Sequence, residues 1–176
     1  MKWIIPDLLC NCRDIGGILT TDGQHIKYGK IVRSASLSKF TQENVEILKQ
    51  YGVSSIIDLR AKGQADIKKD LLWNGVKYYN CPLHQIDEIK QKSSLKDQIA
   101  SYDDGQHLQE RTYESVFLDS VGLKSMKKIF SVLMENDGAT LIHCSQGKDR
   151  TGVILLLIEL ALGVSYEDCL NDYMVR

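Results

Sequence analysis

The sequence predicts an α/β fold, in which a central, mostly parallel, twisted sheet carries helices on both faces. Three short apolar runs have the length of buried strands, and helical patterns separate them along the chain. These runs are residues 53–59, 76–82 and 139–143. Ligands of such sheets bind beyond the carboxyl ends of the strands, so Asp58, Pro82 and Cys144 are expected to face one pocket.

The first half of the chain carries further signals of secondary structure. Residues 26–32 alternate enough to suggest hairpin strands, with turns at Gly23 and Gly29. Thr41 is predicted to cap a helix that Gly52 ends, since a hydroxyl at the start and a glycine at the end are common helix boundaries.

The second half begins with a polar stretch, residues 83–111, that suggests either a cover over the pocket or an inert surface insertion. Residues 113–136 are predicted to form two helices, or one helix bent near Gly122. A last helix is expected to begin at Ser165, with Asp168 as its capping partner.

Composition excludes several classes of protein. The 176 residues include 22 basic and 23 acidic side chains, a balance that argues against a nucleic-acid binder. The longest apolar run, residues 153–162, is too short to span a membrane, so no stable membrane insertion is expected. The first residues lack the apolar core of a secretory signal, which predicts a cytoplasmic protein; export by a route without such a signal stays open.

The cysteines and histidines predict neither a disulfide framework nor a metal site. Five cysteines are an odd number without regular spacing, so all are expected to be thiols. Cys10 and Cys12 form a close pair, but no second pair stands at ligand spacing. His25, His84 and His107 are isolated, and no metal or other cofactor is expected.

One run of residues, 143–152, predicts a site that binds an anion. It lies between the strand at 139–143 and an apolar helical run, so it forms a loop that joins a strand to a helix. Backbone N–H groups in such a loop can curl into a nest for an anion, and the helix dipole favours the same charge. The expected phosphate-binding residues are Ser145, Gln146, Gly147, Lys148, Asp149, Arg150 and Thr151.

Three side chains of this loop have expected roles in a reaction. Arg150 can bind two phosphoryl oxygens at once. Cys144 lies near that cation and a helix start, which lowers a thiol pKa and predicts a thiolate that attacks phosphorus. Thr151 is expected to hydrogen-bond the sulfur, and Gly147 allows the tight turn.

The spacing of Cys144, five residues and Arg150 resembles the signature of the cysteine-based protein-tyrosine phosphatase superfamily. Lys-Asp-Arg-Thr-Gly at 148–152 is similar to the bacterial tyrosine-phosphatase-like family that also accepts phosphoinositides. Residues 11–17, 33–37 and 58–60 resemble further landmarks of that family, in the same order. The chain departs from the pattern at Cys12, where an aromatic residue is usual, and at 61–64, where acidic residues are usual.

The general acid has two candidates. The resemblance implies a catalytic role for Asp149, as the proton donor to the leaving oxygen or as a carboxylate that orients Arg150 or a backbone amide. Asp87 stands shortly after the predicted strand at 76–82, where a covering loop with His84 could bring an acid over the pocket. The motif favours Asp149 over Asp87.

The resemblance implies a phosphatase for phosphotyrosine, with possible activity toward phosphoserine, phosphothreonine or phosphoinositides. The charge of Lys148 beside the phosphate favours a multiply phosphorylated head group as well as phosphotyrosine. Its partner would be a phosphorylated protein or a phosphoinositide. Two alternatives remain: a non-catalytic module that binds phosphorylated ligands, and a cysteine enzyme of the rhodanese or arsenate-reductase kind. Neither a preferred substrate nor an oligomeric state follows from the sequence.

The domain organisation predicted is one phosphatase domain over residues 1–176. No internal repeat or low-complexity tract divides the chain. Relatives of the family often continue with further helices, so these residues are also consistent with a fragment of a longer protein.

Overall fold

A single mixed sheet organises the computed structural model, which describes residues 2–7, 10–83 and 120–175. Its strands lie in the order β1-β2-β3-β6-β4-β5. The bounds are β1 (Lys2–Ile5), β2 (Cys12–Asp14), β3 (Ile31–Ser34), β4 (Val53–Asp58), β5 (Lys77–Asn80) and β6 (Ala139–His143). The strands β3, β6, β4 and β5 run parallel, while β1 and β2 are antiparallel additions at one edge.

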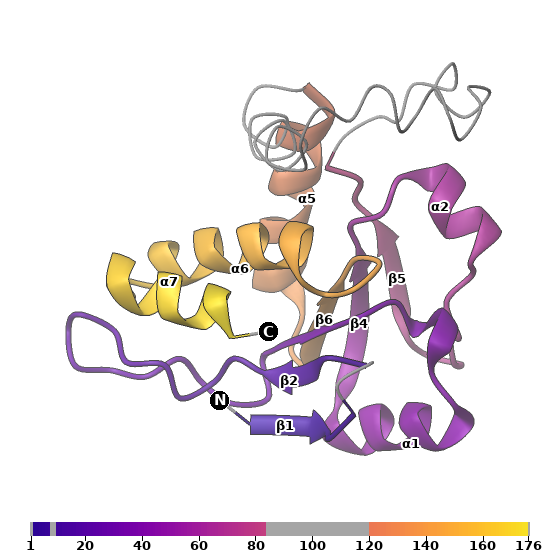
Figure 1. Cartoon of the computed structure of the whole chain (residues 1–176), viewed down its shortest axis with the longest axis horizontal. Helices are drawn as coiled ribbons and strands as arrows, with labels where there is room; N and C mark the ends of the chain where they lie inside the picture. The colour runs from indigo at the N-terminus through magenta and orange to yellow at the C-terminus, as the bar shows by residue number, and fades with distance from the viewer. Residues whose placement is uncertain (1, 8–9, 84–119, 176) are drawn as a thin grey trace.

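Helices lie on both sides of this sheet (Figure 1). Their bounds are η1 (Leu37–Lys39), α1 (Gln42–Tyr51), α2 (Lys62–Ile67), α5 (Ser120–Glu135), α6 (Asp149–Ala161) and α7 (Tyr166–Met174). The fold class predicted from the sequence is therefore confirmed. No helix in the described residues is long and apolar enough to cross a membrane.

The alternating side chains of the strands build a separate core on each face of the sheet. Ile57 and Ile142 point to the face that α5 and α6 cover, where they pack with Ile129 and Ile158. Their chain neighbours Ile56 and Leu141 point to the opposite face. There they belong to a second core with Val53 of β4, Leu37 of η1 and Leu48 of α1. Strands buried on both faces need consecutive apolar residues, which is why the strand runs of this sequence do not alternate.

The parallel strands end at one edge of the sheet, and this edge positions the candidate site. Ser34 pairs with His143, His143 with Asp58, and Asp58 with Asn80. The chain leaves each strand at this edge, so residues far apart in sequence meet there, including Cys144 directly after β6. The expectation that Asp58, Pro82 and Cys144 lie beyond the same strand ends is confirmed.

The predicted helix boundaries agree with the structure in two places. Thr41 caps α1 through a reciprocal pair of hydrogen bonds with Asn44, and Gly52 ends that helix in a left-handed conformation with φ of 92°. Ser165 caps α7 by accepting a hydrogen bond from the Asp168 N–H, at 3.1 Å.

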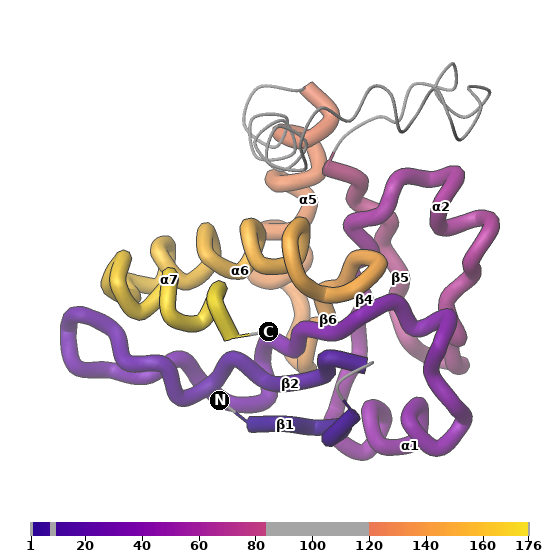
Figure 2. Tube along the Cα trace, in the orientation of Figure 1, coloured from indigo at the N-terminus to yellow at the C-terminus, as the bar shows by residue number. Residues whose placement is uncertain are grey.

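The hairpin predicted at residues 26–32 is wrong in its extent. Gly29 turns the chain with φ of 71°, so the ordered strand begins only at Ile31 and pairs with β2. Residues 18–26 form a loop that is closed by a hydrogen bond from the Ile26 N–H to the Ile18 carbonyl and by an isolated β-bridge between Leu19 and His25. A second isolated β-bridge joins Thr20 to Val164. Figure 2 shows this segment running alongside α6 and α7.

The structure tests the helices predicted for residues 113–136 only from Ser120 onward. From Ser120 onward there is one helix, α5, that continues through Gly122 to Glu135. Residues 113–119, and most of the polar stretch at 83–111, lie outside the described residues.

Candidate active site

The loop between β6 and α6 has the geometry that the sequence predicts. Cys144 is only 3% exposed and follows the last strand residue. Gly147 turns the backbone with φ of 67°, and α6 begins at Asp149, so Asp149 and Arg150 form its first turn. The positive end of this helix therefore faces the same loop as the thiol.

The pKa of the Cys144 thiol is lowered from its ordinary value. Burial is the largest single influence and acts in the opposite direction, because it disfavours the thiolate. Arg150, the Thr151 hydroxyl, and the N–H groups of Thr151 and Gln146 together outweigh it. The Thr151 hydroxyl is buried and has no other partner of standard geometry in the described chain, so its effect falls on the sulfur.

The guanidinium of Arg150 is held at two points. Its Nη2 donates to the Ser145 hydroxyl at 3.1 Å, and its Nη1 donates to Oε1 of Gln64 at 3.1 Å. Gln64 belongs to α2, so a helix distant in sequence aligns the arginine beside the loop. Both acceptors are neutral, and the positive charge stays available to an anion and to the Cys144 sulfur.

Two buried side chains hold the loop from behind. Nδ2 of Asn11 donates to the carbonyls of Gln146 and Gly147, at 3.2 and 3.0 Å. Arg33 donates through Nη2 to the Gly147 carbonyl at 2.9 Å, and through Nη1 to Asp172 of α7 at 3.0 Å. With these carbonyls bound behind the loop, its N–H groups are turned toward the anion-binding side.

The histidine that precedes Cys144 is completely buried among charged groups. Its Nε2 lies 3.3 Å from Asp70 Oδ2, and its Nδ1 lies 3.9 Å from Asp58 Oδ1. Asp58, Asp70 and His143 are close enough together to bind a metal ion, but the guanidinium of Arg60 lies 2.7 Å from Asp58 and 2.6 Å from Asp70. The guanidinium of Arg60 supplies positive charge between the two carboxylates.

Residues 7–175 match the tyrosine phosphatase family. The chain belongs to that family. A Cupriavidus necator protein named as a tyrosine-protein phosphatase is 25% identical over 173 residues, covering 96% of this chain and 60% of the relative. A tyrosine-protein phosphatase of Nostoc commune is 28% identical over 148 residues, covering 82% and 47%. The chain thus spans about half to three fifths of the length of these curated relatives.

Solved structures agree with this fold. The crystal structure of P. aeruginosa TpbA aligns with a TM-score of 0.50 over 86% of this chain and 71% of that chain, at 14% identity. Membership of the tyrosine phosphatase family also argues against the rhodanese or arsenate-reductase class that the reactive cysteine alone left open.

Of the two candidates for the general acid, the structure describes Asp149 but not Asp87. The Asp149 carboxylate is half-buried at the start of α6 and has no hydrogen bond or ion pair within the described residues, so an orienting contact with Arg150 is not seen. Lys148 is also half-buried, at the N-cap of α6. His84 and Asp87 lie outside the described residues.

Several residues around the site were not singled out as site residues from the sequence. Asn11 and Arg33 are in family landmarks, but their contacts with the loop span 114 to 136 residues along the chain. No sequence motif marked Gln64 or Asp70 as a site residue. Gln64 binds Arg150, which is 86 residues away in the chain, and Asp70 lies ten residues after the Arg60 that it binds. Asp70 nevertheless supplies an acidic partner where residues 61–64 lack one.

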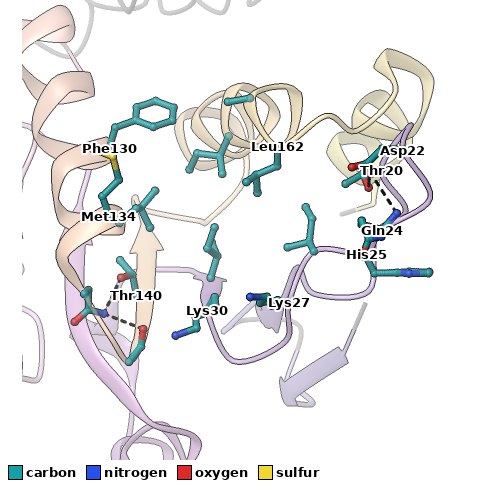
Figure 3. A pocket seen from close by; sticks show the side chains of 17 residues that line it. Thr20, Asp22, Gln24, His25, Lys27, Lys30, Phe130, Met134, Thr140 and Leu162 are labelled. Atoms are coloured by element: carbon teal, nitrogen blue, oxygen red, sulfur yellow. Dashed lines mark hydrogen bonds between the residues drawn. The ribbon is translucent and has the colours of Figure 1, made fainter.

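A cavity of about 480 Å³ lies elsewhere, at the amino ends of β3 and β6 (Figure 3). Phe130, Met134 and Leu162 line one side, while Lys27 and Lys30 line the other. None of the loop residues 144–151 contributes to it. The candidate site is the loop itself, which lies at the opposite end of the strands.

Gly147→Ala should damage both stability and activity. A Cβ at this position would lie 2.3 Å from the Ser34 carbonyl oxygen, and the left-handed backbone adds a cost of about 1–2 kcal/mol. Displacement of the loop by about 1 Å should lower kcat/KM by about a hundredfold. Thermal unfolding and steady-state kinetics measure the two effects.

Gly52→Ala is the matched control. It imposes the same left-handed strain, with φ of 92°, but nothing lies within 4 Å of the added Cβ. It should cost about 1 kcal/mol and leave kcat/KM unchanged. Equal kinetics for the two variants would contradict the packing of Gly147 against Ser34.

Proposed function

We propose that this chain hydrolyses phosphate monoesters through a cysteinyl-phosphate intermediate. The observation that carries the proposal is the lowered pKa of Cys144 beside Arg150, in a loop that leads into a helix. The Cys144 thiolate attacks phosphorus, and the bond from phosphorus to the ester oxygen breaks as that oxygen takes a proton. Water then attacks phosphorus, the S–P bond breaks, and inorganic phosphate leaves with the thiolate restored.

The preferred substrate in this proposal is a phosphotyrosine side chain in a protein. Membership of the tyrosine phosphatase family and the names of the two curated relatives support it. Activity toward phosphoserine, phosphothreonine and phosphoinositides forms the wider part of the proposal. Lys148 supports the phosphoinositide activity, because a second cation near Arg150 in the chain favours ligands that carry more than one phosphate.

A substrate panel tests the proposal. Release of inorganic phosphate is measured from a phosphotyrosine peptide, a phosphoserine peptide and phosphoinositide vesicles, with the wild type and Cys144→Ser. The proposal expects turnover of the phosphotyrosine peptide that disappears in the variant. Binding of all these ligands without turnover by the wild type would instead favour the non-catalytic module.

Asp149 is proposed as the general acid, since its carboxylate is half-buried at the start of α6, at the end of the loop that holds the thiol, and is engaged by no described residue. Asp149→Asn should slow hydrolysis of a phenyl or alkyl phosphate by about a hundredfold, because their leaving oxygens need a proton. p-Nitrophenyl phosphate, with a good leaving group, should lose less than about tenfold.

Asp87→Asn is the matched control for this test. It removes the other candidate carboxylate and should leave both substrates nearly unaffected. The reverse pattern would assign the acid to Asp87, with His84 beside it in the chain. Equal losses on both substrates for Asp149→Asn would show that Asp149 shapes the loop without donating a proton.

The proposal treats residues 1–176 as one phosphatase domain and the cytoplasm as its compartment. All five cysteines are free thiols. Free thiols without disulfides are typical of a reducing compartment, which supports this location.

A further inference from the structure

The cavity of about 480 Å³ lies at the amino ends of β3 and β6, whereas the Cys144 loop follows the carboxyl end of β6. Its volume is within the range of sites that bind small molecules, about 300–1,000 Å³. Its walls come from α5, from the end of α6, and from the chain that precedes β3 (Figure 3). Residues 144–151 do not line it, so a ligand in this cavity would not overlap a phosphate in the Cys144 loop.

One side of the cavity is apolar and open to water. Phe130, Leu133 and Met134 contribute to it from α5. Ile158 and Leu162 contribute from α6 and its C-cap. Met134 is 81% exposed and Leu162 is 48% exposed, so water covers apolar surface here. A ligand with an apolar body would release that water, which favours its binding.

The side formed by the chain before β3 is positively charged. Lys27 and Lys30 line it, opposite the apolar residues (Figure 3). The Lys30 ammonium donates to the Asp137 carbonyl at 2.6 Å, and no hydrogen bond or ion pair joins Lys27 to another residue of the described chain. Neither ammonium is therefore neutralised by a carboxylate within the described residues. This side of the cavity favours an anionic group on the ligand.

A carboxylate, Asp22, also lines the cavity, at the end away from Lys30 (Figure 3). It accepts from the Thr20 hydroxyl at 2.5 Å and from the Gln24 N–H at 3.3 Å, and these hydrogen bonds lower its pKa. With His25 neutral, two lysines and one aspartate leave one net positive charge in the lining. That balance matches a single carboxylate more closely than a phosphate ester, which carries nearly two negative charges.

The two helices decide how such a ligand lies. α5 ends at Glu135 and α6 ends at Ala161, so both helices have their carboxyl ends at the cavity. The partial negative charge of these ends disfavours a carboxylate, whereas a hydrocarbon chain is indifferent to it. The anionic head of the ligand therefore belongs at Lys27 and Lys30, and its apolar body belongs against α5 and α6.

We propose that this cavity binds a medium-chain fatty acid, with its carboxylate at Lys27 and Lys30 and its acyl chain against α5 and the end of α6. The site is separate from the Cys144 loop and does not depend on the proposed phosphatase activity. A linear acyl chain has enough freedom of rotation to follow walls built from leucine, isoleucine and methionine side chains. Its single negative charge matches the charge of the lining.

A chain-length series tests the apolar side. Calorimetric titration of the wild-type protein uses hexanoate, octanoate and decanoate, each below the concentration at which it forms micelles. Each added methylene should tighten binding about fourfold, because the chain buries more apolar surface. Equal affinity for the three acids, or no binding of any of them, would overturn the proposal.

The charged side is tested with a double variant. Lys27→Gln combined with Lys30→Gln should weaken octanoate binding about threefold to tenfold. Octanol, which has the same chain length and no charge, should bind the variant and the wild type equally. The matched control is Lys124→Gln combined with Lys127→Gln, since both lysines are exposed on α5 and neither lines the cavity. An equal loss of octanoate affinity in the two double variants would overturn the placement of the carboxylate.

A third variant locates the acyl chain. Ala161 lines the cavity and is exposed at the end of α6, so Ala161→Phe fills part of the space without entering the core. It should weaken octanoate and octanol alike, by about tenfold or more. Met134→Glu, on the opposite helix, is a second variant that should weaken both ligands, and thermal unfolding shows whether each variant is folded. Unchanged affinity in the two folded variants would place the ligand elsewhere.

Inorganic phosphate separates this cavity from the Cys144 loop. A carboxylate that entered the loop would compete with phosphate for the same N–H groups. Saturating phosphate should therefore leave the affinity for octanoate unchanged within about twofold. Competition between the two ligands would assign the carboxylate to the loop and overturn the proposal, while the proposed phosphatase would stand.

Discussion

Replacement of Cys144 by serine should abolish phosphate release while phosphate is still bound. The lowered pKa of Cys144 favours a thiolate, whereas a serine hydroxyl stays protonated and is a poor nucleophile without a base. The loss should be on the order of a thousandfold or more in kcat. Arg150 and the loop N–H groups stay in place, so calorimetry with inorganic phosphate should give an affinity close to that of the wild type.

Cys81→Ser is the control for this substitution. Cys81 is also buried, but burial raises its pKa to about 11, so it has no thiolate to lose. That variant should keep kcat within about threefold of the wild type. Turnover by Cys144→Ser within tenfold of the wild type would exclude the covalent mechanism.

The sequence predicted those parts of the molecule that depend on neighbouring residues. The strand at Ala139–His143, the turn at Gly147 and the helix after it are encoded in one continuous stretch, where apolar runs flank a loop with glycine. The boundaries of α1 followed from Thr41 and Gly52 in the same way. Local signals of this kind need no knowledge of the rest of the chain.

Contacts across the sheet could not be predicted. Arg33 reaches both the loop carbonyl of Gly147 and Asp172, which is 139 residues away in the chain. Such a bridge depends on the order of the strands, because β3 and β6 become neighbours only in the folded sheet. The same holds for Asp70, which lies in an irregular segment and gains its partners only where the strand ends meet.

The buried arginines explain why the family landmarks surround one loop. Arg13 donates to Asn11, which holds the loop, and to the Val175 carbonyl at 2.8 Å, while Arg33 binds Asp172 of α7. Asn11 and Arg33 both donate to the Gly147 carbonyl, and Arg33 also binds Asp172 near the end of the described chain. Residues near both ends of the described chain are therefore linked to the loop. We infer that the landmarks shape the loop from behind, and that few of them need to touch a ligand.

Arg150→Lys should be the second most damaging substitution. The guanidinium can bind two phosphoryl oxygens with parallel N–H groups, and a lysine ammonium offers a point charge without that fork. The loss of a preorganised donor at a site of developing charge costs about a hundredfold to a thousandfold in kcat. The Cys144 thiol should also ionise at higher pH, since Arg150 is the strongest of the groups that lower its pKa.

Gln64→Ala separates the charge of Arg150 from its orientation. Gln64 accepts from Nη1 at 3.1 Å and fixes the plane of the guanidinium, but it carries no charge and is not among the main groups that lower the thiol pKa. Its removal should lower kcat by about threefold to tenfold, with an unchanged pH profile for alkylation of Cys144. Steady-state kinetics and alkylation rates for the two variants measure both effects. Wild-type efficiency in Arg150→Lys would mean that this guanidinium does not bind the phosphoryl group during the reaction.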